Sequence, residues 1–144
     1  MTARAAHEEP LTTVDALVQL SFLIQRVLAE VGGAHDLSIV QMRMLGALRG
    51  RRASMLALAE RLGLDKSSMT GLVTRAEKRG LVRREPSPHD GRGVLVSLGP
   101  LGEELAARCT QEVSARIAVL TDRLTADERA RLTGLAAALL EPAR

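Results

Sequence analysis

The stretch that decides the fold is Ser54–Leu98, SMLALAERLGLDKSSMTGLVTRAEKRGLVRREPSPHDGRGVLVSL. It predicts a short helix, a tight turn through Gly63, and a second helix that begins after Asp65. Residues 81–98 then place two apolar segments around a loop of turn-forming residues at 86–93, which predicts a β-hairpin. The residues of the first helix that we expect to face the core are Leu56, Ala59 and Leu62. This order of elements is typical of a helix-turn-helix followed by a wing.

The second predicted helix carries two different faces. One is an apolar stripe with positions i, i+3, i+4 and i+7, formed by Met69, Leu72, Val73 and Ala76. The other begins with small polar residues and ends with cations: Ser67, Thr70, Gly71, Thr74, Arg75 and Lys78. Small side chains allow close approach to another surface, and DNA base edges offer both hydrogen-bond donors and acceptors. We therefore interpret the second face as a DNA-reading face.

Basic charge is concentrated in the same segment. Residues 49–93 hold eleven Lys/Arg and five Asp/Glu, a net +6, so the rest of the chain sums to −3 against a total of +3. A concentrated positive charge is what binding to a polyanion requires. A solvated, arginine-rich surface would have the same composition, so charge supports the interpretation only together with the motif.

Composition sets limits on the core, the compartment and the class of protein. The chain has 144 residues, 46 % of them apolar but only 1 % aromatic, so its core and any ligand cavity must be aliphatic. No apolar run approaches the ~18 residues of a membrane span, and the N-terminus lacks a signal-peptide core. The single cysteine cannot form an internal disulfide, which fits a reducing compartment. We expect a cytoplasmic protein with no membrane contact and no cofactor.

Two helices are predicted before the winged unit. The first covers 13–31 and has a broad apolar stripe; we expect Gly32 and Gly33 to end it, because glycine readily takes the left-handed cap conformation. Ser38 and Gln41 form a capping box for the second, which stops near Gly50. The arginines that follow, Arg49, Arg51 and Arg52, have two open interpretations: contact with DNA phosphates, or charge that complements the helix dipole.

Two more helices are predicted after the winged unit. Gly99-Pro100 opens the first, whose apolar positions recur at i+4: Leu101, Leu105, Cys109, Val113 and Ile117. Residues 125–128 form a capping box for the last helix, which has a leucine-rich face. Apolar helices at both ends of the chain would be buried by interleaving with a second copy. We therefore predict a mainly α fold with a small β-hairpin wing, a winged helix-turn-helix flanked by N- and C-terminal dimerisation helices. The three parts are 11–36, 38–98 and 100–141.

These segments together resemble the MarR family of bacterial winged-helix transcription regulators. The matching stretches are LSIVQMRMLGAL, the long segment from LALAERLG to VLVSL, and LTADERARL. The resemblance implies a homodimer, most often a repressor, that binds a palindromic operator in double-stranded DNA and is released by a small-molecule effector. It also implies that the helix over 66–79 enters the major groove, that Arg92 enters the minor groove, and that Asp90 holds wing and reader together.

The predicted DNA-binding residues follow from the face, the charge and the resemblance. Five of them should face bases: Ser67, Thr70, Gly71, Thr74 and Arg75. Three should lie nearer phosphates: Lys66, Ser68 and Lys78. The wing adds Asp90 and Arg92, because a guanidinium fits the narrow and strongly negative minor groove.

The chain departs from the family pattern at a few positions. Its wing reads Asp-Gly-Arg-Gly at 90–93, with one arginine fewer than is common, and we expect it to order fully only on DNA. Gly99 replaces a threonine that often caps the next helix, and Leu58 stands where a carboxylate is common. The near absence of aromatic residues argues against stacking selection of a phenolic effector.

Alternatives to an effector-controlled DNA-binding regulator stay open. Cys109 is a candidate redox sensor, although its place in an apolar stripe argues for an inert thiol. His35 is a candidate effector or metal contact, but the histidines are too scattered for a metal signature. A winged-helix protein-interaction module is the other interpretation, although such modules tend to have apolar residues in place of the polar face. We find no catalytic constellation and expect no enzyme.

Overall fold

The computed structural model describes residues 9–89 and 91–142. The helices are α1 (Thr13–Gly33), α2 (Ile39–Ala47), α3 (Met55–Leu62), α4 (Lys66–Lys78), α5 (Pro100–Thr121) and α6 (Ala126–Leu140). The strands are β1 (Ala53–Ser54), β2 (Val82–Pro86) and β3 (Val94–Leu98). The predicted mainly helical fold with a small β wing is confirmed. None of the described helices is both long and apolar enough to span a membrane.

The predicted helix starts are confirmed by their hydrogen bonds. The Ser38 hydroxyl accepts from the Gln41 backbone N–H at 3.2 Å, and the Gln41 side chain accepts from the Ser38 N–H at 2.9 Å. Thr125 and Glu128 make the same pair of bonds at the start of α6. Each box satisfies two backbone donors that a helix start leaves without partners.

The sheet is antiparallel, with strand order β1-β3-β2. The predicted hairpin pairs β2 with β3 from Val82–Leu98 to Pro86–Val94. Strand β1 joins the other edge of β3, with Ala53 opposite Val96. Sequence reasoning missed β1, because two residues are too few to show an alternating pattern.

An aliphatic core holds the winged unit together. The apolar stripe of α4 is buried as predicted, with exposed fractions of 0–2 % for Met69, Leu72, Val73 and Ala76. The stripe packs with side chains of α2, α3 and the sheet in one continuous cluster. The burial of this stripe determines which face of α4 points to solvent.

One core prediction for α3 is wrong. Leu56 is 70 % exposed, whereas Leu58 is only 1 % exposed and belongs to the core. The Ser54 cap starts the helix at Met55, and in this short helix the buried positions are 58, 59 and 62. The position where a carboxylate is common in the family is therefore a core position here.

Helix α1 ends at Gly33, as predicted, but the left-handed conformation expected of Gly32 and Gly33 is wrong. The described glycines with positive φ are Gly50, Gly63 and Gly80, and α1 runs through Gly33 without a left-handed residue. A Cβ on Gly32 would lie 2.5 Å from the Met42 sulfur, so this glycine allows α1 to approach α2 closely. The left-handed residue after α1 is Asp36, with φ of 54°.

Glycine is also required where α5 leaves the sheet. A Cβ on Gly99 would lie 2.8 Å from the Gly80 carbonyl oxygen, and one on Gly102 would lie 1.9 Å from the Leu81 carbonyl oxygen. A threonine cap at position 99 would therefore collide with the backbone that ends α4. Pro100 occupies the first turn of α5, as predicted.

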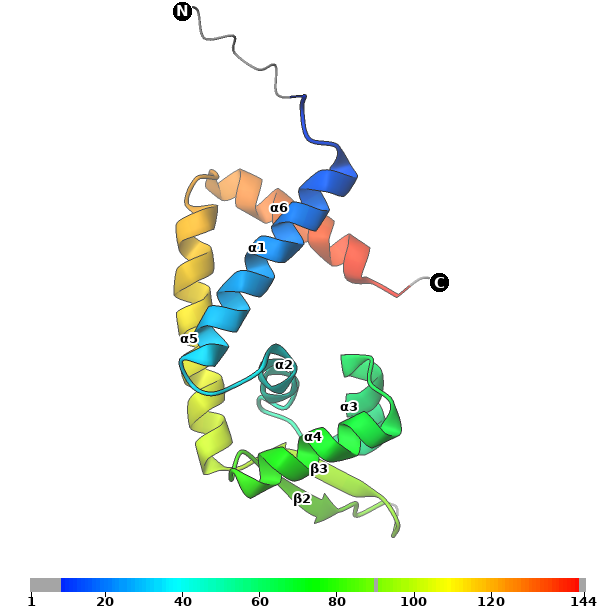
Figure 1. Ribbon diagram of the computed structural model, residues 1–144. Coiled ribbons are helices and arrows are strands. Elements are labelled where there is room, and N and C mark those ends of the chain that lie inside the picture. Colours follow the sequence, from blue (N-terminus) through cyan, green and yellow to red (C-terminus); the bar gives the residue numbers. More distant parts are fainter. Residues whose placement is uncertain (1–8, 90, 143–144) are drawn as a thin grey trace, which may run out of the picture.

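Helix α5 connects the two ends of the molecule. Figure 1 shows it running from the sheet, past α2 and α1, to the turn before α6. Leu105, Val113 and Ile117 pack against the core and Cys109 lies within it, but Leu101 is 43 % exposed, so the predicted i+4 stripe begins one turn later.

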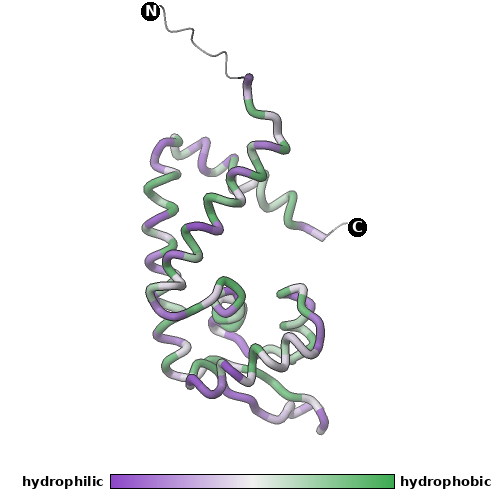
Figure 2. Tube along the Cα trace, in the orientation of Figure 1, coloured by the Kyte–Doolittle hydropathy of each residue, from purple (hydrophilic) through white to green (hydrophobic). Residues whose placement is uncertain are grey.

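The end of the molecule remote from the sheet exposes apolar side chains. Figure 2 shows apolar segments along α1 and α6, and α6 has no buried residue within this chain. The large exposed apolar residues of these two helices are Val14, Leu17, Val18, Leu20, Phe22, Leu132, Leu135, Leu139 and Leu140.

Candidate nucleic-acid interface

The start of helix α4 is fixed by Asp65. Its carboxylate accepts from the Ser68 backbone N–H at 2.7 Å and from the Ser67 hydroxyl at 3.0 Å. These bonds, the one from the Ser68 backbone foremost, hold the pKa of Asp65 below its ordinary value of 3.8. The cap therefore carries a negative charge at neutral pH, at the end of the helix where the dipole favours it.

The predicted reading face of α4 lies opposite the buried stripe. Six of its predicted residues are exposed: Lys66, Ser67, Ser68, Thr70, Arg75 and Lys78. Gly71 and Thr74 are half-buried. The structure thus presents small polar groups, followed by cations, along one accessible helix.

Arg75 folds back along α4 over Gly71. A Cβ built on Gly71 would lie 3.0 Å from Arg75 Nη1, tighter than nearly all real contacts of that kind. The absence of a side chain at position 71 therefore makes room for the guanidinium. This links two predicted base-facing residues that sequence reasoning considered separately.

Arg84 of strand β2 joins the same face. Its Nη2 donates to the Thr74 hydroxyl oxygen at 2.7 Å, which ties the wing strand to the reading helix. Sequence reasoning did not select Arg84, since the contact depends on the position of β2 relative to α4. Because side chains alternate along a strand, the sequence places Arg83 and Arg84 on opposite faces of the hairpin, but it does not tell which of the two faces α4.

The wing tip lies between β2 and β3. The Ser87 N–H donates to the Gly93 carbonyl at 2.9 Å and closes the base of the loop, and Arg92 is exposed. Asp90 lies outside the described residues, so its predicted link between wing and reader stays a prediction.

Two arginines of the cluster after α2 have partners within the chain. Arg49 donates to the Thr110 hydroxyl of α5 at 3.1 Å, and Arg52 pairs with Glu85 of β2 at 3.2 Å. These contacts give both arginines a role in joining elements. Phosphate contact by this cluster stays a prediction.

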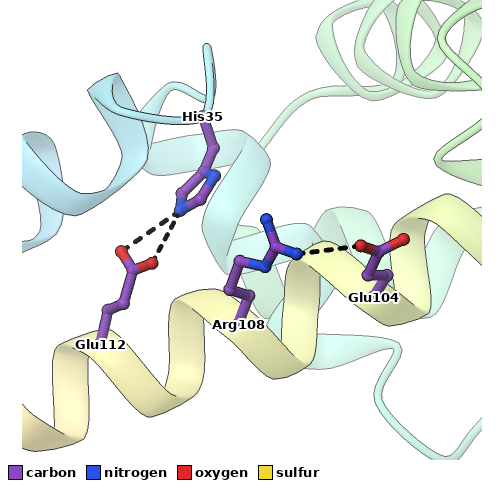
Figure 3. Close-up of polar contacts among 4 residues, drawn as sticks. All are labelled: His35, Glu104, Arg108 and Glu112. Carbon is purple, nitrogen blue, oxygen red and sulfur yellow. Dashed lines mark hydrogen bonds and ion pairs between the residues drawn. The ribbon is translucent and has the colours of Figure 1, made fainter.

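His35 connects the α1–α2 loop to α5. Its Nε2 lies 3.1 and 3.2 Å from the two carboxylate oxygens of Glu112, as Figure 3 shows. The neighbouring Arg108 pairs with Glu104 along the same helix at 3.1 Å. Among the described residues no group of three His, Cys, Asp or Glu side chains is placed to hold a metal ion. His35 thus has a structural partner, and its predicted effector or metal role stays untested.

Cys109 is buried on α5. Burial raises the pKa of its thiol, and the negative charge of Glu112 raises it further. The thiolate is the reactive form, so this environment disfavours oxidation. The geometry gives no support to the redox-sensor alternative.

A cavity of about 230 Å³ lies between α1, α2 and α5. Its lining is mainly aliphatic, with Leu28, Ile39, Met42, Leu45 and Val113, and none of the described residues that line it is aromatic. Cys109 and Arg43 also line it. The prediction of an aliphatic cavity agrees with this lining.

The sequence is similar to known regulators. Residues 35–93 match the family model described as MarR family. The multiple antibiotic resistance protein MarR of Escherichia coli is 34% identical over 109 residues, which cover 74% of this chain and 76% of that protein. The chain belongs to the MarR family. The transcriptional regulator PecS of Dickeya dadantii is 32% identical over 108 residues, 72% of this chain and 65% of that protein.

Solved structures of MarR and of NadR have the same fold. Wild-type MarR from E. coli in its apo form has a TM-score of 0.78 at 29% identity, over 93% of this chain and 100% of that one. A mutant MarR complexed with operator DNA has a TM-score of 0.70 at 30% identity, over 89% of this chain and 96% of the mutant MarR chain. NadR in complex with 4-hydroxyphenylacetate has a TM-score of 0.77 at 25% sequence identity, over 98% of this chain and 100% of the NadR chain. MarR-family members are transcription regulators rather than enzymes, and this chain is a MarR-type transcription regulator.

Proposed function

We propose that the protein is a homodimeric repressor that binds a roughly palindromic operator and is released from it by a small-molecule effector. The observation that carries this proposal is the accessible face of α4, where small polar groups lead to Arg75 and Lys78 and where Arg84 attaches the wing strand. The operator-DNA complex of a MarR mutant supports this use of the fold.

On DNA, α4 enters the major groove and the wing reaches the adjacent minor groove. The small polar residues and Arg75 face base edges, which carry the sequence information. Lys66, Ser68 and Lys78 lie nearer the phosphates, and Arg92 enters the minor groove. In the dimer the two α4 helices meet successive major grooves about 34 Å apart.

The dimer forms through parts 11–36 and 100–141, and part 38–98 reads DNA. The support is the apolar surface of α1 and α6, where Leu135 is 65% exposed and Leu139 is 71% exposed in the single chain. Exposed apolar side chains in this number mark an interaction site, and a second copy supplies the complementary surface by symmetry.

The effector occupies the cavity between α1, α2 and α5. The cavity touches both α5, which leads to the dimerisation end, and α2, which packs in the winged unit. A ligand that binds better to one spacing of the two readers shifts the population towards that spacing. The complex of NadR with 4-hydroxyphenylacetate supports effector binding by this fold.

Titration against DNA tests the proposal. The DNA upstream of the gene for this protein, labelled with a fluorophore, is titrated with the full-length protein at two salt concentrations, with scrambled duplex as competitor. We expect selective binding that weakens steeply as salt rises, because bound phosphates release counterions. Equal binding to scrambled duplex places the operator elsewhere or favours a protein-interaction module, and selection from a randomised duplex library separates the two. No enrichment of any duplex contradicts the proposal.

A further inference from the structure

The hydroxyl groups on the reading face of α4 are not equivalent. The Thr70 hydroxyl donates to the Lys66 carbonyl oxygen at 2.9 Å, and the Ser67 hydroxyl donates to the Asp65 carboxylate at 3.0 Å. Neither a carbonyl nor an ionised carboxylate has a hydrogen to give, so the direction of both bonds is fixed. Each of these hydroxyls already donates its one hydrogen within the protein, so it can only accept a hydrogen bond from a ligand.

Thr74 has the opposite arrangement. Its oxygen accepts from Arg84 Nη2 at 2.7 Å, and a guanidinium has five N–H donors but no acceptor. The helical threonines Thr70, Thr121 and Thr133 donate to the carbonyl four residues before them, whereas Thr110, like Thr74, accepts from an arginine. Within the described part of the chain the Thr74 hydroxyl donates to no group, so its hydrogen remains available.

Thr74 lies on the face of α4 that we propose contacts DNA. Thr74 lies one turn after Thr70 on the same face of α4 and is half-buried, beside the exposed Arg75. The hydroxyl of Thr74 has its hydrogen-bond partner in the wing strand, whereas those of Ser67 and Thr70 have theirs in α4 or its cap.

We propose that Arg84 makes Thr74 the hydrogen-bond donor among these hydroxyls, so that Thr74 favours a base with a major-groove acceptor over cytosine. Guanine offers O6 and N7, thymine O4 and adenine N7, whereas cytosine offers only its amino group as a polar contact. Thr70, in contrast, accepts from the amino group of adenine or cytosine. This inference rests on the proposed function, and Arg84 acts in it as a positioning residue.

Selection from a randomised duplex library tests the inference. The full-length wild-type protein and its Thr74→Val variant are each used to enrich bound duplexes, and the operator position at which valine removes the base preference is the Thr74 contact. We expect the wild type to disfavour cytosine on the contacted strand there by about 2- to 10-fold, the worth of one hydrogen bond. Thr70→Val should flatten a different position, where the wild type prefers an amino group.

The role of Arg84 is tested at the same operator position with four variants. Arg84→Ala should reduce the preference as much as Thr74→Val does, and the double variant should reduce it no further. Arg84→Lys should retain it, since lysine is also only a donor. Arg83→Ala is the matched control: it loses the same charge from the adjacent, equally exposed position of β2, whose side chain points to the other face of the sheet. Circular dichroism verifies that each variant folds.

Three results would overturn the inference. Arg84→Ala with the wild-type preference intact would show that Arg84 does not set the polarity of Thr74. A wild-type preference for cytosine at the Thr74 contact, or no position affected by Thr74→Val, would show that Thr74 is not a donor to a base. If the wild type enriches no duplex at all, the proposed function fails and this inference fails with it.

Discussion

Gly71 lies inside helix α4, where glycine lowers stability. Glycine inside a helix costs about 1 kcal/mol relative to alanine. Here it leaves room for the Arg75 guanidinium, whose Nη1 would be 3.0 Å from an added Cβ. The sequence placed both residues on the reading face, but their contact depends on a side-chain conformation that periodicity does not contain.

We predict that Gly71→Ala stabilises the fold and weakens operator recognition. The free energy of unfolding should rise by about 0.5–1 kcal/mol, measured by urea denaturation at fixed protein concentration. Selective DNA affinity, measured by fluorescence anisotropy, should fall because Arg75 must move. The control is Gly46→Ala in α2, where an added Cβ meets nothing within 4 Å, so stability should change but DNA affinity without effector should not. Unchanged DNA selectivity in Gly71→Ala would show that Arg75 does not need the room left by Gly71.

Asp65 makes the stability of the start of α4 depend on pH. Its pKa is lowered in the folded state, so its contribution is present above the unfolded pKa and is lost as pH falls through the lower folded value. We predict that Asp65→Ala is less stable than wild type at pH 7, and that the difference shrinks below pH 3.8, the ordinary pKa of the group. Urea denaturation from pH 7 to pH 3 measures this. A difference that stays constant to pH 3 would show that the charge of the cap is unimportant.

At the scale of elements, the parts predicted correctly are those that local sequence determines. The caps at Ser38 and Thr125 and the stripe of α4 depend on residues within one or two turns. Strand β1 and the bond from Arg84 to Thr74 depend on how distant segments meet, which no local pattern specifies. The error at Leu56 has a related cause, since α3 has only eight residues and its neighbours decide which ones are buried.

The junction of α5 with the sheet gives a prediction for element packing. A Cβ on Gly102 would lie 1.9 Å from the Leu81 carbonyl oxygen, and this is backbone that cannot move without shifting β2. We predict that Gly102→Ala lowers the free energy of unfolding by about 1–3 kcal/mol, the usual cost of overpacking, despite the higher helix propensity of alanine. Urea denaturation measures the loss, and Gly46→Ala again shows the effect of propensity alone. Equal stability of the two variants would contradict the packing of α5 on the sheet.

For the molecule as a whole, the wing and the proposed dimerisation surface lie towards opposite ends of α5 (Figure 1). We predict that Arg92→Ala lowers operator affinity about tenfold, ~1.4 kcal/mol, and leaves the dimer intact. It should also reduce the slope of log affinity against log salt by about 1 if the guanidinium neutralises one phosphate. Fluorescence anisotropy measures the operator affinity and its salt dependence, and analytical ultracentrifugation measures the oligomeric state. A variant that dissociates into monomers would show that the wing takes part in the dimer.

Substitutions in the proposed dimerisation surface should dissociate the dimer, unlike Arg92→Ala. Leu135 and Leu139 are exposed on α6 and lie one turn apart, so a second copy would bury both at once. Replacing both with glutamate places two charges where the dimer excludes water, and burying an unpaired charge is costly. We predict a monomer by analytical ultracentrifugation, with circular dichroism like that of the wild type because neither leucine belongs to the core of its own chain. Two independent readers lose the high effective concentration that a dimer gives the second half-site, so operator affinity should fall about 100-fold or more. A dimer that persists would place the interface elsewhere, and a monomer with wild-type operator affinity would show that one reader is sufficient.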